Sequence, residues 1–401
     1  MSSFFERFFA TPEVIDTLSD QAVIEAMLRF EAALARAQAS AGLIPQAAAL
    51  SIIGTCKVEL FDCPKLVRES ARSRCMATPL VQSLRETVAL FNPQAADFVH
   101  FGCSVQDLVD TALALVMRDV LKRIEVDLAA TLQSLLALAE KHAHDPMLER
   151  NPMQPASITS FGLLCSQWAA PLVRDRQRMC AASASAMALR LANDLVATAD
   201  MQDQHMQVMA LMAADLQLQE PAFAGNTAHD EVVALACALG LLTGNLGHTA
   251  ACISHMVQFE IGELIPAPAS GALASGAPAM QTVPLAVMCM TVLAHAHRVP
   301  QQVAMLLATL SQERTSLPGH WQAQLAQWPA LLTACQSITS TSAQLVAGMQ
   351  ADTQRMRSNL DAVRASLPAK EIKARFSNDL LKHASRLAHT QIKALRNPPS
   401  V

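Results

Sequence analysis

The chain has 401 residues, a formal net charge of −4 and 52% hydrophobic residues. It lacks the basic field that nucleic acid or an anionic membrane would require, so we expect neither as a partner. Only 4% of the residues are aromatic and 13 are glycine, a composition that favours long helices over a sandwich or barrel. The mean hydropathy of +0.25 is high for a soluble monomer and predicts large buried faces, including interfaces between subunits.

The cysteines and the apolar runs bear on location and cofactors. Ten cysteines are scattered without a CxxC pair or the Cys/His spacing of a zinc site, so we expect reduced thiols, no metal and no cofactor. The N-terminal stretch carries charges within its first apolar run and lacks the apolar core of a signal peptide. The longest apolar run, Val283 to Ala294, is too short to span a bilayer. We therefore predict a cytoplasmic protein that does not enter a membrane.

The first part of the chain predicts a small helical domain over residues 1–98. Ser19 or Asp20 can cap a helix that Gly42 and Pro45 end. After that helix, several prolines break the pattern up to about residue 95.

A central domain of long helices is predicted over residues 99–348. Residues 106–144 contain neither Gly nor Pro, and apolar residues recur there at three- and four-residue steps. Further long helices are expected at 159–201, 230–264 and 284–316. Residues 349–401 are more polar and predict a short C-terminal helical lobe. No strand of useful length is expected, so the predicted fold class is all-α.

Three patches of sequence occur in order along the chain: HFGCSVQDLVDT at 100–111, RNPMQPASITSFG at 150–162, and a loop of Ala, Ser, Gly and Pro at 265–285 that follows FEIGEL. Together they resemble the fumarase/aspartase superfamily of lyases and, among its members, the bacterial 3-carboxy-cis,cis-muconate cycloisomerases. The resemblance implies a fold with small helical domains at both ends of a five-helix central domain. It also implies a homotetramer in which three chains build each site for a small carboxylate substrate.

The same resemblance implies which site residues are kept and which are replaced. In the first patch Ser104 keeps a hydroxyl that holds a substrate carboxylate in relatives, whereas Val105 replaces a second one. In the second patch Pro152 and Pro155 stand where relatives carry the acid/base histidine, and proline can neither donate nor titrate.

In the loop, Ser275 aligns with the serine base of relatives, but Gln281 replaces their lysine and Val283 their asparagine. A serine hydroxyl without a neighbouring cation is too weakly acidic to act as a base. Asp107 and Asp110, near the start of the long helix, suit helix caps and ligands equally.

The candidate site residues form two groups. The candidate catalytic residues are Ser275, His229 and His100. The candidate substrate-binding residues are Ser104, Gln106, Arg150, Gln154, Thr227, Asp230, Gln281 and Arg314.

Three functional hypotheses remain open from the sequence. The first is a diverged enzyme that binds a small carboxylate and performs non-standard lyase, isomerase or addition chemistry. The second is a non-catalytic homologue that acts as a binding or scaffolding protein, or co-assembles with an active paralogue. The third is an orthodox cycloisomerase.

Overall fold

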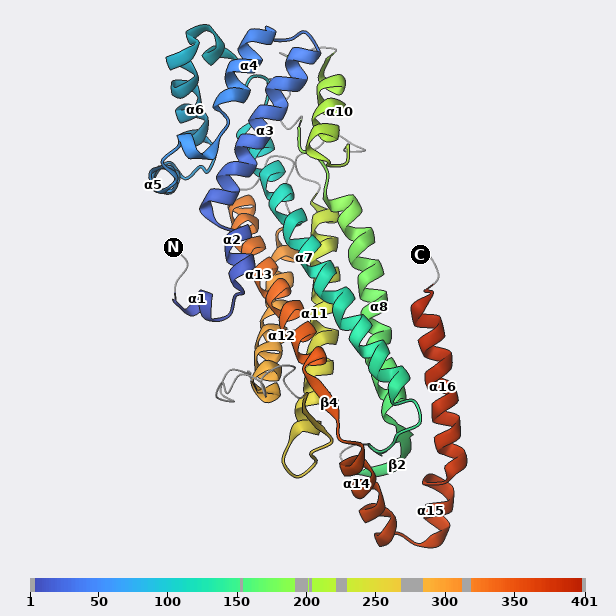
Figure 1. The fold of residues 1–401 in the computed structure, drawn as a ribbon. Helices are drawn as coiled ribbons and strands as arrows, with labels where there is room; N and C mark the ends of the chain where they lie inside the picture. The colour runs from blue at the N-terminus through green and yellow to red at the C-terminus, as the bar shows by residue number, and fades with distance from the viewer. Residues whose placement is uncertain are drawn as a thin grey trace, which may run out of the picture.

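The chain folds into an elongated helical molecule (Figure 1). The computed structural model describes residues 4–151, 154–191, 201, 204–220, 229–267, 284–311 and 319–398. Long helices run along the middle of the molecule, the N-terminal helices cluster at one end, and the last helices lie at the other end (Figure 1). The predicted all-α fold class is confirmed.

The N-terminal end is built from short helices around one long one. Ser19 caps this long helix by accepting a hydrogen bond from the N–H of Ala22 at 3.2 Å, and Gly42 follows its end with φ +78°. The predicted cap and stop are therefore confirmed. The elements are α1 (Phe4–Phe8), α2 (Pro12–Thr17), α3 (Asp20–Ser40), α4 (Gln46–Thr55), η1 (Val58–Leu60), α5 (Cys63–Ser73), α6 (Thr78–Phe91) and η2 (Pro93–Phe98).

The middle of the molecule contains the long helices. They are α7 (Val105–Lys141), α8 (Phe161–Ala186), α11 (Asp230–Val257), α12 (Leu285–Ala308) and α13 (His320–Ala347), with the shorter α10 (His205–Leu216) near the N-terminal end. The prediction for α7 is confirmed to within a few residues. α8 and α11 end earlier than expected. α13, which has Pro329 inside it, was not predicted.

Two small two-stranded sheets, of which only the first is a hairpin, correct the expectation that strands are absent. β1 (Pro146–Arg150) pairs antiparallel with β2 (Pro155–Ser160), and β3 (Leu264–Pro266) pairs antiparallel with β4 (Met349–Ala351). Strands of three to six residues are too short to show a clear alternation of apolar and polar residues, which is why the sequence did not reveal them.

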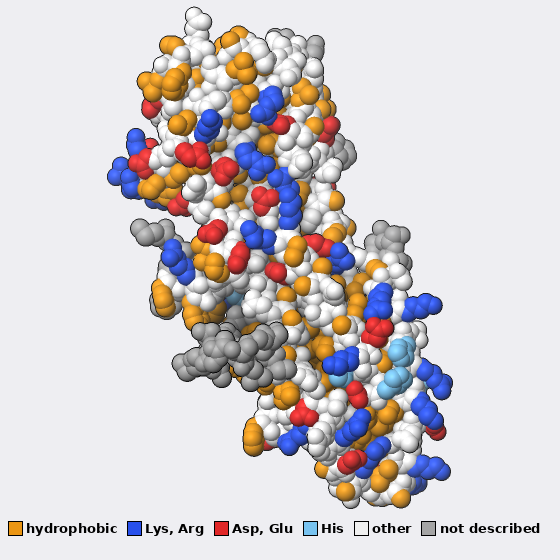
Figure 2. Space-filling view, in the orientation of Figure 1, with side chains coloured by type: hydrophobic (Ala, Val, Ile, Leu, Met, Phe, Trp, Pro, Cys, Tyr) orange, Lys and Arg blue, Asp and Glu red, His pale blue; other side chains and the backbone are white. Residues whose placement is uncertain are grey.

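The C-terminal lobe consists of α14 (Thr353–Ser366), α15 (Ala369–Arg375) and α16 (Asn378–Arg396). The Ser385 hydroxyl of α16 donates to the carbonyl of Ala143 at 2.8 Å, which fastens the last helix beside the end of α7. Basic side chains gather over this end of the molecule, whereas acidic and basic side chains are interspersed elsewhere on the face shown in Figure 2.

Helix α11 forms the centre of the bundle and packs against α8 and α12. It is the one helix in the described ranges that is long and apolar enough to cross a membrane, but 56% of its most apolar window is buried, as in a core helix. A Cβ on Gly247 would lie 2.6 Å from the Cβ of Ala296 on α12, while nothing lies within 4 Å of the corresponding position on Gly244. Close helix approach therefore occurs at Gly247 and not at Gly244.

Candidate functional site

Helix α7 separates the candidate residues into two groups. Ser104 caps its N-terminus, whereas Arg150 and Gln154 belong to the β1–β2 hairpin that follows its C-terminus. At 1.5 Å per residue, the 37 residues of α7 span about 55 Å. One chain therefore does not bring these groups together.

Just before the N-terminal end of α7, the largely buried His100 pairs with the buried carboxylate of Glu31. Its Nδ1 lies 2.6 Å from a carboxylate oxygen of Glu31 and 3.2 Å from the sulfur of Cys103, and its backbone is left-handed, with φ +60°. Burial lowers the pKa of His100, but the carboxylates of Glu31 and Asp107 together outweigh burial, so the net pKa is raised. Burial raises the pKa of Cys103 well above its ordinary value, so Cys103 stays a thiol and is not an activated nucleophile.

The first turn of α7 uses its polar residues partly as caps. Ser104 Oγ accepts from the N–H of Asp107 at 3.2 Å, and the carboxylate of Asp107 accepts from the N–H of Ser104 at 2.8 Å, which forms a capping box. Asp107 was considered as a helix cap or as a substrate ligand, and the structure shows it as a cap. Gln106 instead donates to Asp110 at 3.4 Å and so reaches the pocket below.

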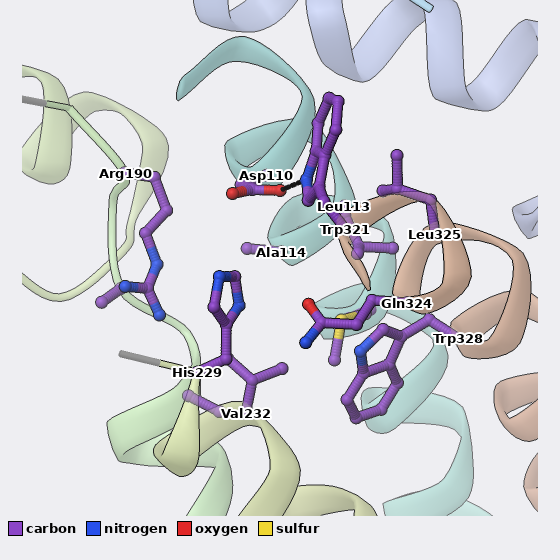
Figure 3. A pocket seen from close by; sticks show the side chains of 13 residues that line it. Asp110, Leu113, Ala114, Arg190, His229, Val232, Trp321, Gln324, Leu325 and Trp328 are labelled. Carbon is purple, nitrogen blue, oxygen red and sulfur yellow. Dashed lines mark hydrogen bonds between the residues drawn. The ribbon is translucent and has the colours of Figure 1, made fainter. Parts of the chain in front are cut away.

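A small pocket lies one turn further along α7. Asp110, Arg190 and His229 line it from three separate parts of the chain, together with Trp321 and Gln324 of α13 (Figure 3). The indole N–H of Trp321 donates to Asp110 at 2.7 Å. The cavity has a volume of ≈30 Å³, so in this conformation it has room for water but not for an organic acid.

Burial and the neighbouring groups shift the pKa of Asp110 in opposite directions. Burial raises its pKa, and the hydrogen bond from Trp321 and the nearby His229 and Arg190 lower it by less. In the described part of the chain, the guanidinium of Arg190 has no hydrogen bond or ion pair of its own. This arrangement offers a cationic group and a carboxyl group of raised pKa in one place, a combination common at functional sites.

At the other end of α7, Arg150 has a partner. Its two terminal nitrogens bind the two carboxylate oxygens of Glu263 at 3.0 and 2.7 Å, and Asn359 donates to the same carboxylate at 2.9 Å. Glu263 is fully buried. Arg150 thus ties the β1–β2 hairpin to the residue before β3 and to α14.

The remaining candidates are on the surface or outside the described residues. Gln154 and Asp230 are exposed, the latter as the first residue of α11. Four candidates, Ser275, Thr227, Gln281 and Arg314, lie outside the described residues. Across the described ranges, no group of three or more His, Cys, Asp or Glu side chains is placed to hold a metal ion.

Sequence reasoning missed Arg190 and Trp321. Arg190 lies just beyond the end of α8 in a stretch without a motif, and it reaches the site only through tertiary contacts. A weak signal existed for Trp321, because it is one of only three tryptophans in the chain.

Comparison with known proteins identifies the family. The family profile described as lyase matches residues 7–272, which is well over half of the chain. The chain belongs to the fumarase/aspartase family of lyases. It is 33% identical over 371 residues to the 3-carboxy-cis,cis-muconate cycloisomerase of Pseudomonas putida, covering 92% of this chain and 87% of the relative.

Two further relatives support the same family. The corresponding cycloisomerase of Bradyrhizobium diazoefficiens is 31% identical over 385 residues, which cover 94% of this chain and 85% of that protein. The crystal structure of the 3-carboxy-cis,cis-muconate lactonizing enzyme from Pseudomonas putida superposes on this chain with a TM-score of 0.84 and 30% sequence identity. The match covers 98% of this chain and 87% of the lactonizing enzyme. The expected fold and family are confirmed.

Proposed function

We propose that this chain binds a small carboxylate at the N-terminal end of α7 and performs lyase or isomerase chemistry that differs from that of its relatives. The convergence of Arg190, His229 and Asp110 on one pocket carries the proposal (Figure 3). A guanidinium and an imidazole on one wall fit a carboxylate. A carboxyl group of raised pKa beside them is suited to transfer a proton at neutral pH.

The chemistry follows from these roles. Arg190 and His229 hold the substrate carboxylate, and Asp110 removes a proton from the carbon next to it. The positive side chains stabilise the charge that then accumulates on the carboxylate, while a group leaves the adjacent carbon. Because the pocket is small, the indole of Trp321 has to leave Asp110 before a substrate enters.

We propose a homotetramer on the grounds of exposed apolar side chains. Val126 of α7, Leu241 of α11 and Met290 of α12 are 67%, 52% and 67% exposed, although all three lie on bundle helices. Packing of central helices from several copies would cover them and could bring the hairpin end of one copy to the α7 N-terminus of another. Light scattering should give about four chains, and a stable monomer would contradict this assembly.

A non-catalytic role is the second candidate, either as a binding protein or as the partner of an active paralogue. Its support is Pro155, an exposed residue at the start of β2, where the sequence resemblance leads us to expect the acid/base histidine of the cycloisomerases. In that role the Arg190 pocket binds a carboxylate without turnover.

The decisive experiment combines binding and turnover. Purified protein is screened by thermal shift against mono-, di- and tricarboxylates, using Arg190→Gln and, as a control, Arg386→Gln on the exposed face of α16. Stabilisation that is lost only in Arg190→Gln supports the site, and no response to any acid contradicts it. Each acid that binds is then followed for product formation; binding without products favours the non-catalytic role.

The orthodox activity is tested in parallel. Turnover of 3-carboxy-cis,cis-muconate that survives in Arg190→Gln but is lost in Ser275→Ala would contradict the proposed site and favour a cycloisomerase like the relatives.

A further inference from the structure

A second, larger cavity lies on the other side of α13. It has a volume of ≈550 Å³, within the usual range for small-molecule pockets. Helices α1, α2 and the start of α3 form one wall, and α12 and α13 form the other. Apolar side chains form a little over half of its lining, among them Val14, Ile15, Leu18, Pro329, Ala330 and Ala334.

One polar side chain that lines this cavity is almost completely buried. His295 of α12 is 1% exposed, and neither of its ring nitrogens forms a hydrogen bond of normal geometry within the described structure. The ring of Phe9 packs edge-on against it, with 5.8 Å between centroids. The carbonyl of Phe9 is the one group that acts on this ring as a hydrogen-bond acceptor among the described residues, and it does so without normal hydrogen-bond geometry. A buried imidazole that is poorly satisfied costs free energy.

Charged groups line the same cavity as His295. Arg298, one turn further along α12, places its guanidinium 5.7 Å from the centre of the Phe9 ring. Arg7 of α1 and Asp20 of α3 also line the cavity. Among the described lining residues, the charged groups are two guanidinium groups and one carboxylate, which together carry a net positive charge.

We propose that this cavity is an accessory binding site for a small organic anion, namely a carboxylate on an apolar body. The carboxylate pairs with Arg298 and Arg7 and accepts a hydrogen bond from the ring of His295, while the apolar body packs on α2 and α13. Phe9 has to move aside for the imidazole to be reached. The lining residues of this cavity and of the Arg190 pocket do not overlap, so this site does not depend on the function proposed above.

The protonation state of His295 agrees with this role. Burial, and next the positive charge of Arg298, lower its pKa to about 4, and the Phe9 carbonyl raises it by less. At neutral pH the ring is therefore uncharged and offers one N–H donor and one acceptor. It directs an anion by a hydrogen bond, and the arginines supply the charge.

Calorimetric titration with benzoate, acetate and inorganic phosphate tests the proposal. Benzoate should bind to the wild type more tightly than acetate, because acetate lacks the apolar body, and more tightly than phosphate. Binding should persist in Arg190→Gln and weaken at least tenfold in His295→Phe, which keeps the packing against Phe9 but has no N–H. Arg298→Gln should weaken it similarly, and Arg386→Gln should not change it.

Several outcomes would overturn the proposal. Benzoate that fails to bind, or that binds His295→Phe and Arg298→Gln as well as the wild type, shows that the cavity is not an anion site. Loss of binding only in Arg190→Gln assigns benzoate to the other pocket and likewise contradicts it. If His295→Phe does not fold, Arg298→Gln decides, because Arg298 is exposed and its replacement leaves the core intact.

Discussion

Thr111 and Arg190 are joined by two hydrogen bonds across 79 residues of sequence. The N–H of Arg190 donates to the Thr111 hydroxyl at 3.2 Å, and that hydroxyl donates to the Arg190 carbonyl at 3.1 Å. Thr111 is fully buried on α7. This pair fixes the backbone of Arg190 beside the pocket that holds Asp110 and His229.

Replacing Thr111 by Val should therefore release Arg190. Loss of both bonds leaves backbone groups unsatisfied, with an expected cost of about 1–3 kcal/mol in the free energy of unfolding. Affinity for a carboxylate ligand should fall at least tenfold in calorimetry. Thr131→Val is the matched control, because Thr131 is also buried on α7 but donates only to Asp127 within the helix. Equal ligand affinity in Thr111→Val and the wild type would show that this clamp does not position the site.

Arg150→Ala should act on stability. The substitution leaves the buried Glu263 carboxylate without its cation, with an expected cost of about 3–5 kcal/mol in urea unfolding. Arg357→Ala, which removes an exposed contact with Asp145 at 3.4 Å, should cost less than about 1 kcal/mol. If Arg150→Ala instead leaves stability unchanged and weakens ligand binding, Arg150 is a substrate ligand.

Asp110→Asn should change the pH dependence of stability. Because the pKa of Asp110 is raised by burial above its ordinary value of 3.8, the folded state binds this proton more tightly than the unfolded chain. Its contribution to stability is therefore present at low pH and is lost as the pH rises above about 3.8. Relative to the wild type, Asp110→Asn should gain stability between pH 4 and pH 8 in urea titrations. A relative loss over that range would contradict the raised pKa.

His295→Phe should change the pH dependence of stability in the opposite direction to Asp110→Asn. The pKa of His295 is lowered to about 4, while an unfolded histidine titrates near about 6.5. Between these two pH values His295 is protonated in the unfolded chain but not in the folded state. Stability therefore falls as the pH drops through this window. The free energy of unfolding that is lost across this window is on the order of 3 kcal/mol.

The measurement is urea unfolding from pH 7 to pH 4. The decrease in the free energy of unfolding between pH 7 and pH 4 should be smaller in His295→Phe than in the wild type by roughly that amount. The charged residues that line the same cavity, Arg7, Asp20 and Arg298, are present in both proteins and contribute equally to the pH dependence. Identical slopes for the two proteins would mean that His295 is not held neutral.

Gly247→Ala and Gly244→Ala form a pair on one helix. An added methyl group at position 247 would meet the Cβ of Ala296 at 2.6 Å, whereas position 244 is open. The first substitution should cost about 1–3 kcal/mol through overpacking, and the second should be neutral or stabilise by up to about 1 kcal/mol. Thermal unfolding distinguishes them, and equal effects would contradict the close approach of α11 and α12.

The sequence alone determined the local features of this protein. Helix α7 was predictable because its residues lack Gly and Pro and its apolar side chains recur with the period of a helix. The start of α3 was predictable because capping is a bond between residues three positions apart. The resemblance carried by three short patches gave the family, which the comparisons confirmed.

Only the tertiary structure decided how side chains are used. Arg150 was expected to bind substrate, but it is paired with Glu263, 113 residues away. Arg190 carries no motif and is placed by Thr111, and His295, which no sequence motif marks, lines a cavity. Periodicity and capping depend on neighbours along the chain, whereas ion pairs, burial and cavities depend on residues that only the fold brings together.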